Sequence, residues 1–145
     1  MWWHTLDALD RTPHHPTRLL PAALTISPIA IVASLPLAWH HLHIPGGSYA
    51  VVDGFSADSW LIVVAVLAIA FAIRTFLRMP SLGVKWAVTA LAFATVDGMF
   101  IDYFDWSLRG VSLYVQPYYG PGFFVSLAAA AVLVLAAILV WRTPD

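Results

Sequence analysis

The chain has 145 residues, of which 61% are hydrophobic and only 10% are charged, and its mean hydropathy is +0.81. A soluble domain carries about a quarter charged residues, so this composition predicts an integral membrane protein. The net charge of -1 offers no basic field for nucleic acid, and the absence of cysteine excludes disulfides, thiolate metal sites and iron–sulfur clusters. Every acid is an aspartate, which is compatible with a GC-rich bacterial genome.

Residues 1–18 differ from the rest of the chain because polar residues interrupt them at short intervals. Trp2, Leu6 and Leu9 share one helical face, while two aspartates point elsewhere. This pattern predicts a short interfacial helix that a tryptophan anchors at the membrane surface.

Four apolar stretches follow, at about 19–39, 60–77, 82–104 and 123–141. Because about 20 apolar residues cross the hydrocarbon core, each stretch is long enough for one membrane helix. We therefore expect an all-α, four-helix membrane domain over 1–145, with outer loops at 40–59 and 105–122. Pro28 removes a backbone donor within the first stretch and predicts a kink there.

The basic residues predict the orientation of these helices. With four spans, six bases fall on one side of the membrane: Arg11, Arg18, Arg74, Arg78, Lys85 and Arg142. Only Arg109 falls on the other side. The positive-inside rule then places both termini in the cytoplasm of a bacterial cell, with the protein in its inner membrane.

Asp97 is the one charge at apparent membrane depth away from the end of a span. An ionisable group there is expensive and marks a functional or pairing site. Its neighbours include a stripe of small residues that lets another helix approach closely, Ala90, Ala94 and Gly98. We therefore expect Asp97 to face a seam between helices, flanked by Phe93 and Ile101.

The outer end of the third span holds a wider polar cluster. Asp105 lies on a face near that of Asp97, whereas Asp102 points well away from it. Burial raises the pKa of a carboxyl, so Asp97 is expected either to be protonated or to have a cationic partner. The candidate partners are Arg109 and the histidines 40–43.

His41 and His43 form a second candidate site. Two residues apart, they suit a loop or strand pair of metal ligands, and imidazole with a nearby carboxylate fits zinc or copper. No further histidine pair or fixed motif accompanies them, so solvated interfacial histidines are the competing interpretation.

A loop rich in Tyr, Gly and Pro precedes the fourth span, and its aromatic side chains are a third candidate surface: Tyr114, Tyr118, Tyr119, Phe123 and Phe124. Aromatic residues are enriched in membrane-interface belts and in protein interfaces. The loop therefore suits contact with lipid, with a quinone or with a partner subunit.

No nucleophile motif, phosphate loop or cytoplasmic catalytic domain is present, so we expect no enzyme and no resident cofactor. The first hypothesis is an accessory subunit that packs against other membrane subunits of a larger complex. The second is a small transporter or proton-handling protein that uses Asp97. The third is an outer-face metal or ligand site at the histidines 40–43 and a nearby aspartate.

Overall fold

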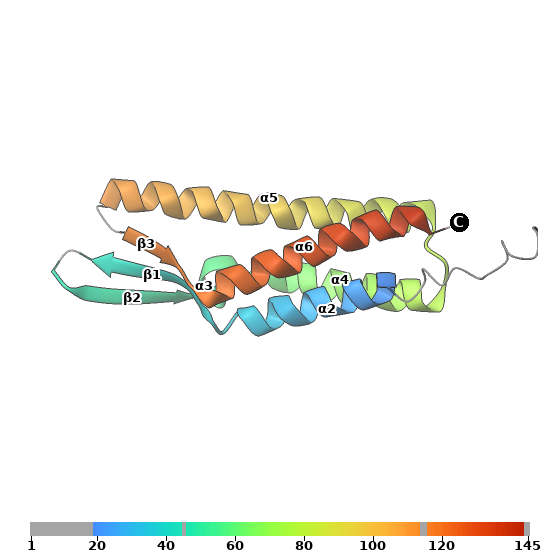
Figure 1. Ribbon diagram of the computed structural model, residues 1–145, viewed down its shortest axis with the longest axis horizontal. Helices are drawn as coiled ribbons and strands as arrows, with labels where there is room; N and C mark the ends of the chain where they lie inside the picture. The colour runs from blue at the N-terminus through green and yellow to red at the C-terminus, as the bar shows by residue number, and fades with distance from the viewer. Residues whose placement is uncertain (1–18, 45, 114–115, 144–145) are drawn as a thin grey trace, which may run out of the picture.

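The computed structural model describes residues 19–44, 46–113 and 116–143, and it shows an elongated helical bundle with a small sheet at one end (Figure 1). Four long helices lie along the bundle: α2 (Leu19–Ser34), α4 (Leu61–Leu77), α5 (Leu82–Leu113) and α6 (Pro121–Arg142). A five-residue helix, α3 (Gly54–Asp58), precedes α4. The expectation for 1–18 and the aromatic call at Tyr114 lie outside the described residues.

The sheet consists of three antiparallel strands in the order β2-β1-β3, namely β1 (Ala38–Ile44), β2 (Ser48–Asp53) and β3 (Gln116–Tyr119). β1 and β2 form a hairpin in which Ile44 pairs with Ser48. The turn contains Gly46 and Gly47, whose φ angles of 109° and 91° lie in the region that glycine adopts most readily. β3 joins the other edge of β1, so the sheet links the start of α6 to the end of α2.

The prediction of an all-α fold was therefore wrong. Residues 40–59 contain β1, β2 and α3 in place of a polar loop, and α5 extends to Leu113 in place of ending near 104. The first predicted span, 19–39, ends as a helix at Ser34, because the chain turns and continues as β1. The predicted ranges 60–77 and 123–141 agree closely with α4 and α6.

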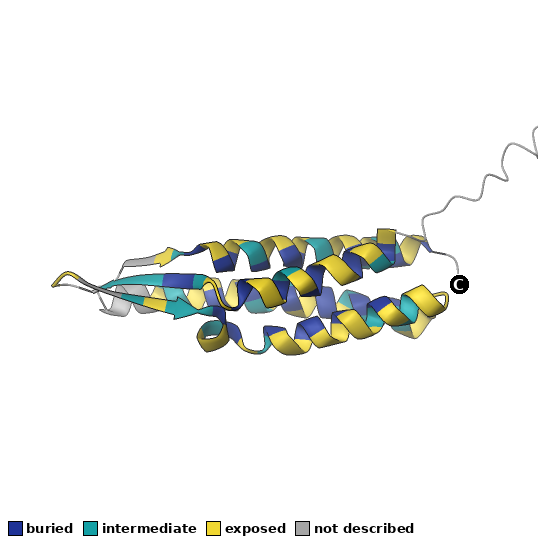
Figure 2. Ribbon diagram, turned by 90° about the horizontal axis from the view of Figure 1, so that it is seen from below, coloured by how far each residue is buried: buried dark blue, intermediate teal, exposed yellow. Residues whose placement is uncertain are grey.

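Among the described residues, two helices are long and apolar enough to cross a membrane, Leu82–Leu108 within α5 and Pro121–Arg142. α2 and α4 are apolar but shorter, at 16 and 17 residues. Exposed residues alternate with buried ones along all four helices (Figure 2), and many of the exposed ones are large and hydrophobic. Helices that are apolar on every face are typical of membrane spans or of the core of a large protein, so the surface indicates membrane association.

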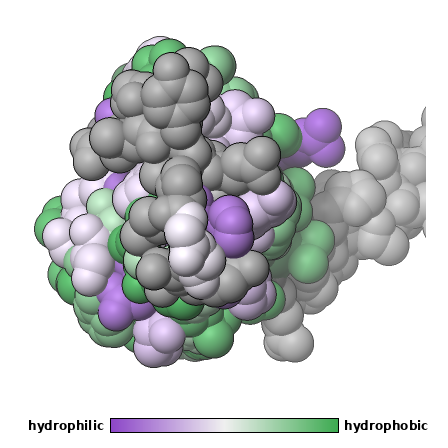
Figure 3. Space-filling model, turned by 90° about the vertical axis from the view of Figure 1, so that its left-hand side faces the viewer, coloured by the Kyte–Doolittle hydropathy of each residue, from purple (hydrophilic) through white to green (hydrophobic). Residues whose placement is uncertain are grey.

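Charge divides between the two ends of the bundle. The described bases of α4, of α6 and of the start of α5 lie at the end away from the sheet, namely Arg74, Arg78, Lys85 and Arg142 (Figure 1). The sheet end carries four aspartates, Asp53, Asp58, Asp102 and Asp105. Seen from that end, hydrophilic residues occupy part of the surface and hydrophobic ones appear at its margin (Figure 3).

Trp39 joins the sheet to the bundle. Its side chain is fully buried, and its Nε1 donates to the carbonyl oxygen of Ser34 at 2.9 Å. The Trp39 carbonyl accepts from the backbone N–H of Gly120 at 2.7 Å, which holds the start of α6 against β1. The sheet therefore forms a fixed cap on the helix ends, and this cap positions the site described next.

Candidate functional site

Asp97 lies on the outward face of α5, so the expectation that it faces a helix–helix seam was wrong. Its side chain is exposed, as are Ala90 and Ala94, while Gly98 is partly covered by the ring of Trp60. Phe93 and Ile101 are also exposed. The small-residue stripe therefore lies mostly on the outside of the bundle, and only its last member makes a close packing contact.

Neither expected partner reaches Asp97. Arg109 follows it by twelve residues on the same helix, which separates the two backbone positions by roughly 18 Å along the axis. His40 pairs with Asp102 instead. Asp97 makes no hydrogen bond or ion pair with the part of the chain that the structure describes.

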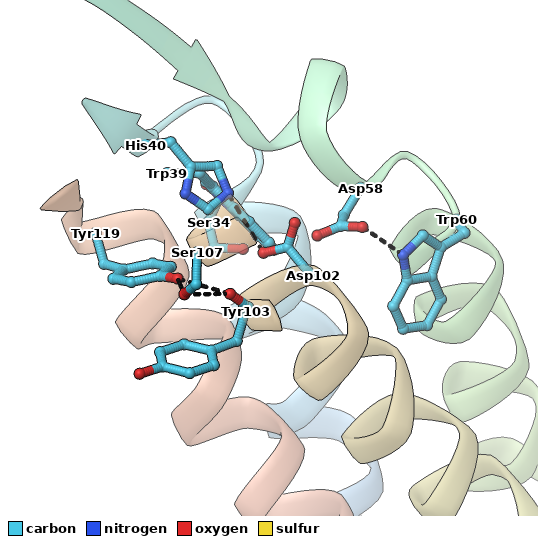
Figure 4. Close-up of polar contacts among 9 residues, drawn as sticks. All are labelled: Ser34, Trp39, His40, Asp58, Trp60, Asp102, Tyr103, Ser107 and Tyr119. Carbon is cyan, nitrogen blue, oxygen red and sulfur yellow. Dashed lines mark hydrogen bonds and ion pairs between the residues drawn. The ribbon is translucent and has the colours of Figure 1, made fainter. Parts of the chain in front are cut away.

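Asp102 takes the inward position, which confirms that it points away from Asp97. It is buried, and its Oδ2 lies 3.3 Å from Nε2 of His40 in β1. Asp58, at the end of α3, is also buried, and its Oδ1 accepts a hydrogen bond of 2.7 Å from Nε1 of Trp60. Figure 4 shows Asp58 and Asp102 pointing toward one another between these two contacts. We call His40, Asp58 and Asp102 the buried cluster.

His40 is fully enclosed by rings. Trp106 stacks on it with 4.2 Å between ring centroids, and Tyr119 meets it edge-on at 5.4 Å. Phe123 lies on the same side at 6.2 Å. This enclosure shields the His40 ring from water.

Electrostatics in the buried cluster favour a bound proton. Desolvation, followed by the negative charge of Asp102, raises the pKa of Asp58 from 3.8 to about 6, against the opposing hydrogen bond from Trp60. The second oxygen of Asp58, Oδ2 of Asp102 and Nδ1 of His40 have no hydrogen-bond partner among the described residues. A proton on Asp58 would supply a donor that two facing carboxylates otherwise lack.

Asp105, the third predicted acid of α5, is exposed. The side chain of Arg109 lies outside what the structure describes. Asp53 caps α3, since its Oδ1 accepts from the backbone N–H of Ser56 at 2.8 Å, and this bond lowers the pKa of its carboxyl. The acids of the sheet end therefore have different roles, and only Asp58 and Asp102 come together.

His41 and His43 lie on one face of β1, opposite the face that carries His40. A strand pair is the arrangement that their spacing suggested. Among the described residues no group of three or more histidines and acids is placed to hold a metal ion. The zinc or copper site stays a prediction.

The aromatic residues around the start of α6 differ in burial and in contacts. Tyr119 stacks on Tyr103 with 5.3 Å between centroids, and its hydroxyl donates to the Tyr103 carbonyl at 3.0 Å. Burial raises the pKa of the Tyr119 phenol. Phe123 is buried, whereas Tyr118 and Phe124 are exposed. Tyr119 and Phe123 thus support the buried cluster, whereas Tyr118 and Phe124 lie on the surface.

Sequence reasoning missed Asp58, Trp60 and Trp106 as site residues. One signal was available, because Gly46-Gly47 between two strand-like stretches is a hairpin pattern that places His40 beside the helix ends. Comparison with protein-family models, with curated proteins and with solved structures finds no match to this chain.

Proposed function

We propose that the protein is a non-catalytic accessory subunit of a larger bacterial membrane complex, and that it docks on a different membrane protein through the outward face of α5. Four helices cross the inner membrane with both termini in the cytoplasm. The observation that carries the proposal is Asp97, an exposed carboxylate in the middle of a candidate membrane span.

The depth of Asp97 follows from helix geometry. It lies eleven residues after Trp86 and nine before Trp106, or roughly 16 Å and 14 Å along the axis of α5. Tryptophans mark membrane–water interfaces, and the hydrocarbon core is about 30 Å thick. Gly98, next to Asp97, packs on Trp60 at the start of α4, so we infer that Asp97 lies in the outer half of the hydrocarbon core. Translocon-based scales assign an aspartate about 2.5–3.5 kcal/mol at the centre of a span, and this cost falls toward the interface. A partner that pairs with the carboxylate offsets this cost.

The partner is a different protein, because the described helices of a second copy offer no base at the level of Asp97. In the described helices the basic residues of α4 and α6 lie in the last turn, Lys85 lies near the start of α5, and Arg109 lies near its end. α2 contains none. A helix of another membrane protein with Arg or Lys at the level of Asp97, in the outer half of its span, would match the charge of Asp97.

The neighbouring surface suits such a helix. Phe93, Ile101 and Phe104 are 71%, 62% and 57% exposed around Asp97. Ala90 and Ala94 leave room for close approach between them. Tyr118 and Phe124 extend the exposed aromatic surface toward the sheet end.

Photo-crosslinking in the host cells tests the proposal. A photoreactive residue at Ile101 should capture one membrane protein that has a base within an apolar span. The same residue at Ile29 on α2, which is equally exposed at 62%, should not capture it. Asp97→Leu should remove the cross-link and the co-purification, and Asp53→Asn should leave both intact.

Several results would overturn the proposal. One is a protein that purifies as a stable monomer or homo-oligomer with no co-purifying partner. Another is equal capture from Ile101 and Ile29. If the Asp97→Leu variant still cross-links to and co-purifies with the partner, the carboxylate does not contribute to the contact.

A further inference from the structure

The buried cluster brings three ionisable side chains from three separate elements into one largely buried place. His40 comes from β1, Asp58 from α3 and Asp102 from α5. Asp102 lies 3.3 Å from His40, and Asp58 faces Asp102 from the other side (Figure 4). These contacts join the sheet and α3 to the end of the longest helix.

The cluster has too few hydrogen-bond donors for its acceptors. Trp60 supplies one donor to Asp58, and Nε2 of His40 lies 3.3 Å from Oδ2 of Asp102, but the remaining oxygen of Asp58 has no hydrogen-bond partner among the described residues. Two ionised carboxylates that face each other in a dry site repel. A proton held between them removes one charge and supplies the missing hydrogen bond.

We propose that the buried cluster is a proton-binding site that holds α3 and the β1–β2 hairpin against α5, and that this contact weakens when the proton leaves. With the proton bound, Asp58 donates to Asp102, and Asp102 retains its contact with His40. Without it, two charged carboxylates face each other, and α3 is the element that can move away.

The pH range follows from Asp58. Its pKa is raised from 3.8 to about 6 in the folded chain, so the folded state binds this proton about 100-fold more tightly than the unfolded state. The stabilisation is complete below the ordinary value of 3.8 and is lost as the pH rises through about 6. The contact is therefore tight in acid and loose at neutral pH.

Other titratable groups surround the cluster without taking its place. Tyr119 of β3 and Tyr103 of α5 are the nearby phenols, and burial raises the pKa of Tyr119. Asp53 of β2 is partly exposed and caps α3, and Asp105 of α5 is exposed. His41 and His43 lie on the other face of β1. α6 contributes Phe123, which has no charge.

The test measures unfolding of the purified full chain in mixed micelles at several pH values. In wild type the unfolding equilibrium constant should rise about 50-fold from about pH 4 to about pH 7. Asp58→Asn mimics the protonated state and still accepts from Trp60, so its profile should be nearly flat in this range. Asp97→Asn, the matched change on the exposed face of α5, should keep the wild-type profile.

A second variant and a direct titration test whether Asp58 is the group that binds the proton. Asp102→Asn removes the charge that raises the pKa of Asp58, so the transition should move to lower pH. Carbon-13 NMR of labelled carboxyls in wild type should show one aspartate titrating near pH 6, and its signal should be absent in Asp58→Asn. Identical profiles for wild type and Asp58→Asn, or equal flattening by Asp97→Asn, would overturn the proposal. None of these measurements needs a partner, so the outcome is separate from that of the docking proposal.

Discussion

Gly122→Ala should destabilise the joint between the sheet and the bundle. Gly122 lies in the first turn of α6, beside the fully buried ring of Trp39. A Cβ there would contact Cδ1 of Trp39 and lie 2.6 Å from its Nε1 and 2.9 Å from the Ser34 carbonyl oxygen. The indole cannot withdraw, because Gly54 approaches the same edge of the ring from the other side, where a Cβ would lie 2.7 Å from Cε2.

The expected cost combines two effects. Overpacking a well-packed site costs about 1–3 kcal/mol. Displacement of the ring also breaks the hydrogen bond of 2.9 Å from Trp39 to Ser34, which adds about 1 kcal/mol. Greater helix propensity of alanine returns up to about 1 kcal/mol. The unfolding free energy should therefore fall by about 1–3 kcal/mol.

Reversible unfolding in mixed micelles, followed by circular dichroism, measures this change. Gly83→Ala is the matched control, because a Cβ at Gly83 of α5 would meet no atom within 4 Å. It should be neutral or stabilising by up to about 1 kcal/mol. Equal stability of Gly122→Ala and Gly83→Ala would refute the view that glycine at 122 is required by the ring of Trp39.

Three further substitutions test two contacts close to the cap. Ser34→Ala and Ser126→Ala each break the 2.6 Å contact between hydroxyls of α2 and α6. Each should lower the unfolding free energy by about 0.5–1.5 kcal/mol in the same assay. If the two costs simply add in the double variant, the two hydroxyls do not interact. Tyr119→Phe keeps the ring stacked on Tyr103 but loses the 3.0 Å bond to its carbonyl, so it should cost about 1 kcal/mol, and hydrogen exchange should show faster opening around Ser107. An unchanged exchange rate there would show that the hydroxyl does not secure β3.

The helices of the bundle were predictable because long apolar stretches allow few other structures. α4 begins at Leu61 and α6 ends at Arg142, each within one or two residues of the expected bounds. Pro28, the position of the predicted kink, is buried within α2. The sheet was missed because β1 and β2 are rich in histidine and small residues, and alternation is visible only once Gly46-Gly47 is taken as a hairpin turn.

The direction of Asp97 was not predictable from the pattern, because α5 is apolar on nearly every face. Small residues were taken to mark the packed side, yet Ala90 and Ala94 are exposed. The packed side instead carries Leu91, Thr95 and Asp102, separated by four and seven residues. Thr95 is fully buried, and its hydroxyl donates to the Leu91 carbonyl within the same helix. A hydropathy pattern therefore does not identify this polar residue as part of the packed side.

Asp97 and Asp102 show how one helix can serve two purposes. Five residues turn an α-helix by about 140°, so one carboxylate points out of the bundle and the other into it. The inner one has His40 and Asp58 within this chain. The outer one makes no hydrogen bond or ion pair with the described residues. The proposed docking face and the proposed proton site can therefore be altered one at a time, and each aspartate serves as the control for the other.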